Sequence, residues 1–157
     1  MPVALLHLGP SLWIGLILFK FLDFMSFLLA SVIVDVEPFL VMFFGLRYPL
    51  HGFFHSFVGG SIVAIWVALI MYYFKNIVRK LAIIFRLQQD SSFKKILWSS
   101  IFGVYFHIFL DAFLYSDIQP FYPSTVNPLL GLFSSGQIHF FCSISFLIAI
   151  IVYFIRL

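Results

Sequence analysis

Two short stretches place pairs of metal-binding or proton-carrying side chains four residues apart in otherwise apolar sequence. His51 and His55 form one pair, and His107 and Asp111 form the other. Residues at this spacing lie on one face of a helix, so both members of a pair reach the same region. Because ionisable groups in apolar helices usually face one another, a cavity or a cation, the two pairs indicate a shared polar site.

Three further residues of the same chemical types stand in or beside apolar runs: His7, Asp35 and Glu37. At the rise of about 1.5 Å per helical residue, all three are expected near the depth of the His107–Asp111 pair. The histidine pair comes out nearer the outer surface, and His55 is its deeper member. Most of these side chains are therefore expected in one layer.

Imidazole and carboxylate together form the ligand set of zinc, and also of manganese and iron. The group contains no cysteine, which disfavours a structural zinc site. A proton path would use the same residue types but would not need so many of them in one layer. The sequence therefore predicts one or two divalent ions, zinc first, bound by His7, Asp35, His51, His55, His107 and Asp111.

The composition indicates a membrane protein. Of the 157 residues, 63% are hydrophobic and only 10% are charged, and the mean hydropathy is +1.12. Soluble domains are only about half apolar. The apolar residues fall into blocks, and about 20 such residues in a helix cross a bilayer. The alternating pattern of a barrel strand is absent, so the spans must be helices.

We therefore expect an all-α membrane protein, a single integral membrane domain over residues 1–157 with about five transmembrane helices. The first two should form a short hairpin that turns at Lys20 to Asp23. One long helix over residues 11–36 is the alternative, but it would leave that charged pair in mid-membrane, where charges are costly. The helices are expected at residues 4–21, 24–44, 55–74, 97–116 and 138–156.

Residues 75–95 predict the orientation. Six lysines and arginines stand there against one acid, Asp90. Basic loops remain on the cytoplasmic side, which puts the N-terminus outside and the C-terminus inside. This loop is expected to form an amphipathic helix on anionic lipid headgroups. Residues 117–137 are then an outer loop in which Asp117 is an ordinary loop acid.

Other features exclude further classes. The net charge of +3 is concentrated in the basic loop, so lipids and not nucleic acid are the expected environment and partner. The single cysteine, Cys142, excludes an internal disulfide. No basic residue precedes the first apolar run, which argues against a cleaved signal peptide. His139 is expected to be an interfacial residue near the outer end of its helix.

The candidate site also resembles a family, the predicted membrane-bound metal-dependent hydrolases, including the LexA-binding, inner-membrane-associated type. The resemblance rests on His7 and on the segments "SVIVDVEP", "HGFFHS" and "GVYFHIFLDAF". The family tends to have Pro-Asp-x-Asp and His-Arg-x-x-Thr-His-Ser-like segments. Here Val34, Glu37, Gly52 and Phe54 replace the proline, the second aspartate, the arginine and the threonine. The resemblance implies the inner, cytoplasmic membrane of a prokaryote.

The order of the ligands is also similar to part of the pattern of zinc-dependent phospholipase C and P1 nuclease. This resemblance implies that one ion is held by Asp35, His107, Asp111 and one of His51 and His55. His7 and Asp111 would then help to hold a second ion.

These features together predict a membrane-embedded metal-dependent hydrolase that cleaves a phosphoester of a lipid near the outer leaflet. The metal would lower the pKa of a bound water and stabilise charge on a phosphoryl oxygen. Asp35 or Glu37 is the expected catalytic proton acceptor. Arg47 could contact the phosphate, with an interfacial anchor beside Tyr48 as the alternative.

Two other functions remain open. One is a metal-ion or proton transporter that uses the same histidine and aspartate cluster. It requires a continuous polar route to the cytoplasm, which the sequence below the site does not offer. The other is a membrane-anchored binding protein with a vestigial site, whose active surface would be the basic loop.

Overall fold

The computed structural model describes residues 4–156, and the regular structure in that range is entirely helical, with no strand. The predicted all-α fold class is therefore confirmed. In chain order the elements are η1 Ala4–His7, α1 Leu8–Ile17, α2 Phe24–Ile33, α3 Val36–Phe44, η2 Phe53–His55, α4 Phe57–Tyr73, α5 Lys75–Ile83, α6 Phe93–Ala112 and α7 Ser135–Arg156.

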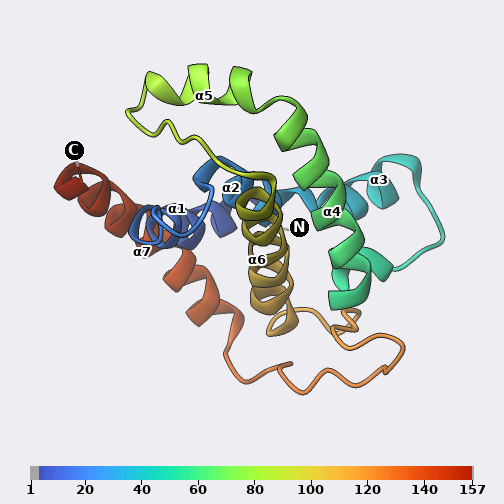
Figure 1. Ribbon diagram of the computed structural model, residues 1–157. Coiled ribbons are helices and arrows are strands. Elements are labelled where there is room, and N and C mark those ends of the chain that lie inside the picture. Colours follow the sequence, from blue (N-terminus) through green and yellow to red (C-terminus); the bar gives the residue numbers. More distant parts are fainter. Residues whose placement is uncertain (1–3, 157) are drawn as a thin grey trace.

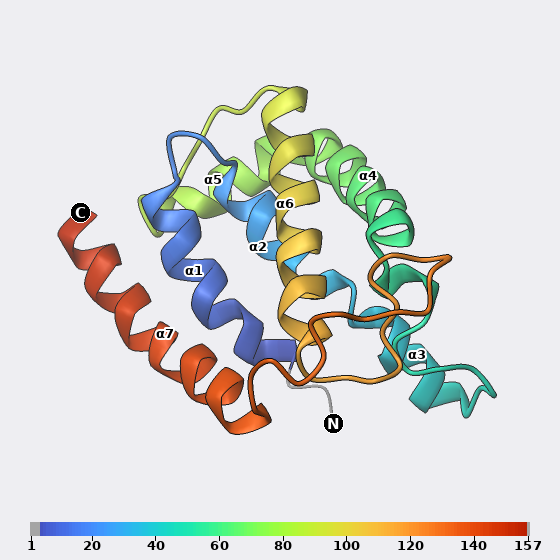
Figure 2. The ribbon, with the colours of Figure 1, turned by 90° about the horizontal axis from the view of Figure 1, so that it is seen from below.

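Helix α6 occupies the centre of the bundle. Figure 2 shows α1 and α7 on one side of it and α4 on the other. Helices α2 and α4 both pack directly on α6, while α1 packs between α2 and α7. Ile96, Val104 and Ile108 of α6 are almost fully buried, and they form the main apolar core with α2 and α4. A side chain that points inward from α6 therefore meets residues from both neighbours.

Two glycines set the close approach of these helices. A Cβ atom at Gly103 of α6 would lie 2.5 Å from the Phe27 carbonyl oxygen and 2.8 Å from the Ala30 Cβ of α2. At Gly60 of α4 it would lie 2.6 Å from the Ile108 side chain of α6. Small residues let helix backbones come this close, as is common between membrane helices. The two contacts bring the end of α2 and the start of α4, next to which site residues lie, close to α6.

The chain turns between α1 and α2, so the two form separate helices rather than one long helix. Asp23 caps α2, and its carboxylate accepts a hydrogen bond from the Ser26 backbone N–H. The Gln89 side-chain amide donates to the carbonyls of Phe19 and Leu22, while its oxygen accepts from the Phe24 N–H. The Gln89 side chain thus hydrogen-bonds to backbone groups at the turn between α1 and α2 that have no partner within a helix.

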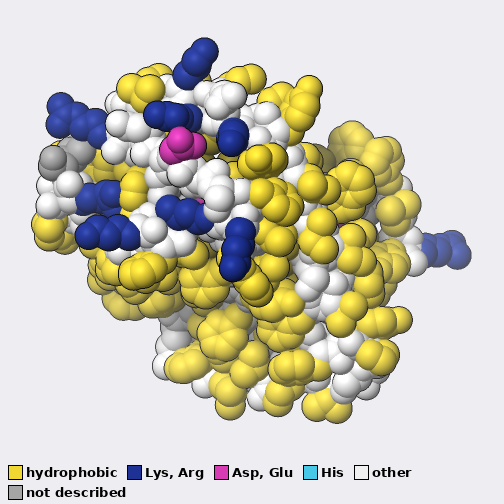
Figure 3. All heavy atoms as spheres, in the orientation of Figure 1, with side chains coloured by type: hydrophobic (Ala, Val, Ile, Leu, Met, Phe, Trp, Pro, Cys, Tyr) yellow, Lys and Arg dark blue, Asp and Glu magenta, His cyan; other side chains and the backbone are white. Residues whose placement is uncertain are grey.

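The basic segment lies at the end of the bundle away from the C-terminus of α6. Helix α5 bends away from α4 by 73°, which Figure 1 shows as a sharp turn of the chain. It carries Lys75, Arg79 and Lys80 together with exposed apolar residues such as Ile77 and Leu81. In Figure 3 the lysine and arginine side chains gather over this region, while apolar side chains cover much of the remaining face. This arrangement is typical of an amphipathic interfacial helix.

The expectation of about five transmembrane helices is wrong. By length and apolar composition, two stretches of the described chain could cross a membrane, Phe24–Phe44 and Ser135–Arg156. A third is added if Phe57–Tyr73 and the bent Lys75–Ile83 count as one broken span. The apolar helix at Leu5–Ile17 is too short. Helix α6 carries Lys94, Lys95, His107 and Asp111 among its 20 residues, and it is not one of the stretches that are long and apolar enough to cross a membrane.

Candidate metal centre

Helix α6 provides the two polar side chains at the centre of the site. His107 and Asp111 lie one helical turn apart, and the His107 Nε2 is 3.1 Å from the Asp111 Oδ2. Their side chains are 0% and 1% exposed. The spacing of four residues and the buried position of α6 together direct both groups into the interior of the bundle. The other candidate ligands approach these two residues from neighbouring segments.

Asp35 approaches His107 and Asp111 from the break between α2 and α3. Pro38 has no N–H, and its ring conflicts with the carbonyl of the residue four positions earlier, Val34. The α-helix accordingly stops at Ile33 and restarts at Val36. Across the break, hydrogen bonds span three residues instead of four, from the Asp35 N–H to the Val32 carbonyl and from the Glu37 N–H to the Val34 carbonyl. The Asp35 Oδ1 lies 3.7 Å from the His107 Nε2. The proline thus places a carboxylate at a helix break that faces α6.

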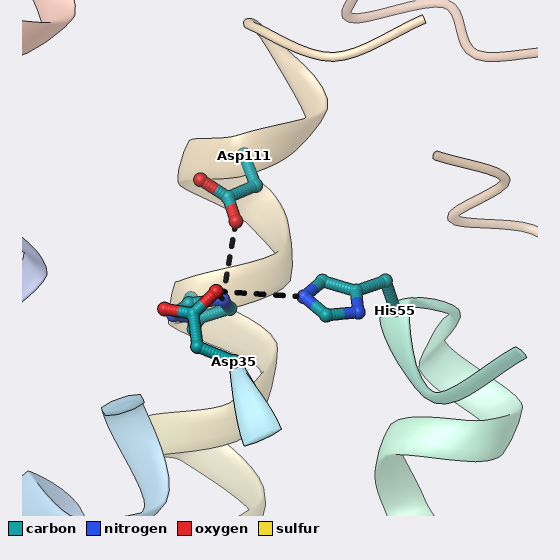
Figure 4. Close-up of side chains that lie close together, drawn as sticks. Asp35, His55 and Asp111 are labelled. Atoms are coloured by element: carbon teal, nitrogen blue, oxygen red, sulfur yellow. Dashed lines mark ion pairs between the residues drawn. The ribbon is translucent and has the colours of Figure 1, made fainter. Parts of the chain in front are cut away.

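His55 comes from the opposite side, directly before α4. It ends the short helix η2, and Ser56 then caps α4 by accepting a hydrogen bond from the Gly59 N–H. The His55 Nε2 is 3.9 Å from the Asp35 Oδ1. Figure 4 shows Asp35, His55 and Asp111 pointing toward one another from three separate segments. The site therefore exists only when α2, α4 and α6 are packed together.

The Nδ1 atoms of His55 and His107, which point away from the centre of the site, contact hydrogen-bond acceptors. The His107 Nδ1 is 2.9 Å from the Ser31 carbonyl oxygen, and the His55 Nδ1 is 2.8 Å from the Glu37 Oε2. We assign the ring proton to Nδ1 in each case, because only an N–H donates to these oxygens. The Nε2 lone pairs then face the centre of the site. Metal-binding histidines are oriented in this way by a carbonyl or carboxylate behind the ring.

Six side-chain atoms of this group are buried and lack hydrogen-bond partners. They are the Nε2 atoms of His55 and His107 and both carboxylate oxygens of Asp35 and Asp111. The His107 Nε2 is close to Asp111, but this approach does not have the direction of a hydrogen bond. Buried polar atoms without partners are destabilising, and clusters of them usually contact an ion or water. A divalent cation would contact one atom of each of these four side chains.

One ligand atom from each of Asp35, His55, His107 and Asp111 lies within 4.8 Å of the other three. Ligand atoms of a tetrahedral zinc ion are about 3.3 Å apart, so binding would draw the four atoms inward. This buried group could hold a metal ion, as the sequence predicted. Two nitrogens and two carboxylate oxygens suit zinc, and also manganese or iron, and they do not identify one of these metals.

His7 lies beside this group and not within it. Its Nε2 is 3.2 Å from the Asp111 Oδ1, and its Nδ1 is 3.2 Å from the His107 Nδ1. The two imidazole rings meet edge to face, with their centroids 4.7 Å apart. The predicted second ion would have His7 and Asp111 as ligands here. In the described structure, His7 contacts Oδ1 of Asp111, whereas His107 contacts Oδ2.

His51 also lies next to the four-residue group. Its ring is edge-on to His55, with the centroids 4.9 Å apart, and Tyr115 stacks on it at 4.1 Å. The Asp117 carboxylate accepts hydrogen bonds from the His51 backbone N–H at 3.0 Å and from its ring Nδ1 at 2.9 Å. The His51 Nε2 is buried without a partner. Of the two histidines in this segment, His55 is the closer to the other candidate ligands.

Asp117 is therefore more than the loop acid that the sequence indicated. Burial acts to raise the pKa of its carboxyl group, but the two hydrogen bonds from His51 outweigh burial and hold that pKa below its usual value. Asp117 thus remains ionised and fixes His51. No pattern in the sequence marks this contact, because it forms when the loop after α6 folds back over the segment before α4. The Phe57 N–H, which donates to the Pro120 carbonyl at 2.9 Å, belongs to the same contact.

Two other residues considered from the sequence lie at the periphery. His139, in the first turns of α7, is half-buried, and its Nδ1 is 3.5 Å from the Ser135 hydroxyl. Arg47 is exposed in the segment after α3.

No protein-family model matches the chain, and neither the curated proteins nor the solved structures contain a match to it. The resemblance to membrane-bound metal-dependent hydrolases therefore remains a prediction from the site residues. The class of protein that the structure itself defines is an all-helical bundle with two stretches able to cross a membrane and a buried His/Asp group that could hold a metal ion.

Proposed function

We propose that the protein is a membrane-embedded metal-dependent hydrolase in which Asp35, His55, His107 and Asp111 bind a divalent cation. The observation that supports this proposal best is the cluster of inward-facing ligand atoms that are buried without hydrogen-bond partners. Helices α2, α4 and α6 each direct part of the set to one point. A packed core that retained these groups with no ion would leave two carboxylates and two imidazole lone pairs unsatisfied.

The metal, with zinc as the first candidate, would supply Lewis-acid chemistry, lowering the pKa of a water and stabilising charge on a phosphoryl oxygen. His55 and His107 present Nε2, and Asp111 presents Oδ2. Asp35 faces both histidines through Oδ1. Its Oδ2 has no partner, so we assign to it the acceptance of a proton from the attacking water.

Glu37 has a different part in this proposal. Its Oε2 holds the His55 ring, and its Oε1 accepts a hydrogen bond from the Phe54 backbone N–H at 3.3 Å. Both oxygens are therefore engaged away from the centre of the site. We assign Glu37 as a positioning residue for His55, which leaves Asp35 as the better candidate of the two predicted proton acceptors.

The proposed substrate is a phosphoester at the membrane surface. Lys94 and Lys95 stand at the start of α6, and His107 and Asp111 stand near its other end. If the basic end faces the cytoplasm, the site lies toward the outer leaflet, with the N-terminus outside and the C-terminus inside. The proposed location is the inner membrane of a prokaryote. Lipid phosphoesters are the substrates that such a site would meet.

The test is release of phosphate-containing headgroups from mixed lipids by detergent-purified protein, before and after chelation and with zinc, manganese or iron added back. We expect release that chelation abolishes and one of these metals restores. His107→Ala should reduce the rate to the chelated level, while His139→Ala, a matched histidine outside the group, should leave it unchanged. Release that is indifferent to chelation would overturn the proposal.

One observation favours a second candidate function, a structural metal that clamps the bundle. The exposed fractions of Asp35, His55, His107 and Asp111 are 8%, 0%, 0% and 1%, and structural sites are closed whereas catalytic sites keep an open position. A structural ion would raise the melting temperature without supporting any hydrolysis. The same purified protein, tested for both properties, distinguishes the two functions.

A further inference from the structure

Two cavities of opposite character flank the candidate metal centre. One, with a volume of about 270 Å³, is lined by polar and aromatic residues that include Tyr48, His51, Asp117, Gln119 and Tyr122. We call it the polar cavity. The other is an apolar groove of about 410 Å³. We call it the α3–α4 groove, and its lining includes Val34, Val36, Glu37, Leu40, Tyr48 and Val63. Both volumes lie at or near the lower end of the range of small-molecule sites.

Each cavity reaches a residue that contacts the metal ligands. The lining of the polar cavity includes His51, whose ring centroid is 4.9 Å from that of His55. The lining of the α3–α4 groove includes Glu37, whose Oε2 is 2.8 Å from the His55 Nδ1. Val34 and Val36, on either side of Asp35 in the chain, also line this groove. Tyr48 lines both cavities, so they share one wall beside the metal centre.

The charge in the polar cavity suits a cationic group. The Asp117 carboxylate is 37% exposed, and Tyr48 and Tyr122 share the cavity lining with it. The described lining of this cavity contains no lysine or arginine. An ammonium group gains from a carboxylate and from the faces of aromatic rings. An anionic headgroup would meet the Asp117 charge without any compensating cation.

The α3–α4 groove suits a hydrocarbon chain. Its lining is almost wholly apolar, and it belongs in part to Phe24–Phe44, a stretch long and apolar enough to cross a membrane. A second apolar groove, of about 510 Å³, lies among α1, α2 and α7 and is lined by Leu12, Leu28 and Ile150 among others. That groove is lined by none of the predicted site residues. It therefore provides an internal comparison for ordinary contact with lipid chains.

We propose that the two cavities together bind one single-chain phospholipid with a cationic headgroup beside the metal centre. The acyl chain lies in the α3–α4 groove, the phosphate lies at the wall by Tyr48 that the two cavities share, and the ammonium group lies in the polar cavity beside Asp117. This assignment names the substrate class of the proposed hydrolase and rests on that function for the reaction. The binding itself is tested without turnover.

The probe is a lysophosphatidylcholine with a photoreactive diazirine in its acyl chain. It is crosslinked to detergent-purified protein in the presence of chelator, and the labelled residues are located by mass spectrometry. We expect labelling at residues of the α3–α4 groove such as Leu40 and Val63. Unlabelled lysophosphatidylcholine should compete with the probe. Glycerophosphocholine, which has no chain, should not compete. Lysophosphatidylglycerol, which has no ammonium group, should compete about tenfold less well, in line with the strength of a partly desolvated cation–aromatic contact.

Matched variants separate this site from general lipid contact. Val63→Phe fills the α3–α4 groove and should reduce labelling there about tenfold, roughly the effect of excluding two methylenes from an apolar site. Ile150→Phe, in the comparison groove, should not change it. Leu40→Trp, at the exposed rim of the α3–α4 groove, is the second blocking variant if Val63→Phe lowers the melting temperature. Asp117→Asn should remove the preference for choline over glycerol.

Three results would overturn the proposal. The first is equal labelling of both grooves, and the second is labelling that Val63→Phe and Leu40→Trp leave unchanged. The third is equal competition by lysophosphatidylcholine and lysophosphatidylglycerol. Failure of the hydrolase function gives a different result, which is specific labelling of the α3–α4 groove with no metal-dependent phosphate release from any lipid. A further result is metal-dependent phosphate release from lysophospholipids at a rate that the groove-blocking variants do not change. That result would support the hydrolase function and reject this binding mode.

Discussion

The Glu37 Oε2 lies 2.8 Å from the His55 Nδ1, although the two residues are 18 positions apart and belong to different helical segments. This contact fixes the tautomer and the direction of a ring whose other nitrogen faces the candidate metal centre. The same residue also lines the α3–α4 groove. The orientation of a metal ligand and the shape of the neighbouring cavity therefore depend on one carboxylate.

Removal of this contact should weaken metal binding. For Glu37→Ala we expect a decrease in zinc affinity of about 10–100-fold, the usual effect of losing a carboxylate behind a metal-binding histidine. Glu37→Gln retains a hydrogen-bond acceptor and should lose less. Competition with a zinc-chelating dye measures both, and Asp90→Ala, an exposed acid far from the site, is the control. Wild-type affinity in Glu37→Ala would show that the contact does not orient a ligand.

The close contact at Gly103 should be important for stability. Gly103→Ala inserts a Cβ atom against the Phe27 carbonyl and the Ala30 side chain, so we expect a loss of about 1–3 kcal/mol in the free energy of unfolding. Gly136→Ala adds the same atom where no neighbour lies within 4 Å, and it should be neutral or slightly stabilising. Unfolding by denaturing detergent compares the two. Equal stability of both variants would contradict the packing described for α2 and α6.

Pro38 should affect the site more than the fold. In Pro38→Ala the steric conflict with the Val34 carbonyl is removed, so α2 and α3 are free to join as one helix. Asp35 would then rotate away from His107. We expect helix content and thermal stability to be retained or increased, while zinc affinity falls. Circular dichroism and metal titration measure the two effects, and Pro10→Ala, in the first turn of α1, is the control. Unchanged zinc affinity together with increased helicity would show that the break does not position Asp35.

Metal stabilisation should disappear in acid. Imidazole and carboxylate bind a metal in their deprotonated forms, so each ion that binds displaces protons. Imidazole takes up a proton at about pH 6 to 7. The difference in melting temperature with and without zinc should therefore be full at pH 8 and small at pH 5. A difference that is independent of pH would indicate that histidines do not hold the ion.

The sequence predicted the parts of the site that depend on local spacing. The turn from His107 to Asp111 follows from helical geometry, and an acid beside Pro38 in an apolar run is visible in the chain. The structure brings Asp35, His55, His107 and Asp111 within 4.8 Å, with His7 and His51 beside them. Convergence of separate helices was expected because buried ionisable groups need partners.

The remaining features depend on tertiary contacts that no local pattern encodes. Glu37 was predicted as a candidate proton acceptor, and only the folded structure shows that its carboxylate contacts the His55 ring. Asp117 meets His51 only because a loop folds back across a separation of 66 residues. The number of spans was overestimated because an apolar block in the sequence does not give the length of the helix that forms there, and the helix at Leu5–Ile17 is too short to cross a membrane.

The most direct test of the metal centre is the metal content of protein purified in mild detergent without chelator, measured by elemental mass spectrometry. Wild type should carry about one zinc, manganese or iron ion per chain, in line with the four-residue group of Asp35, His55, His107 and Asp111. The double variant His107→Ala with Asp111→Ala should carry almost none, while His139→Ala should match wild type. If wild type and the double variant hold the same small amount of metal, the inward-facing histidines and aspartates do not form a metal centre.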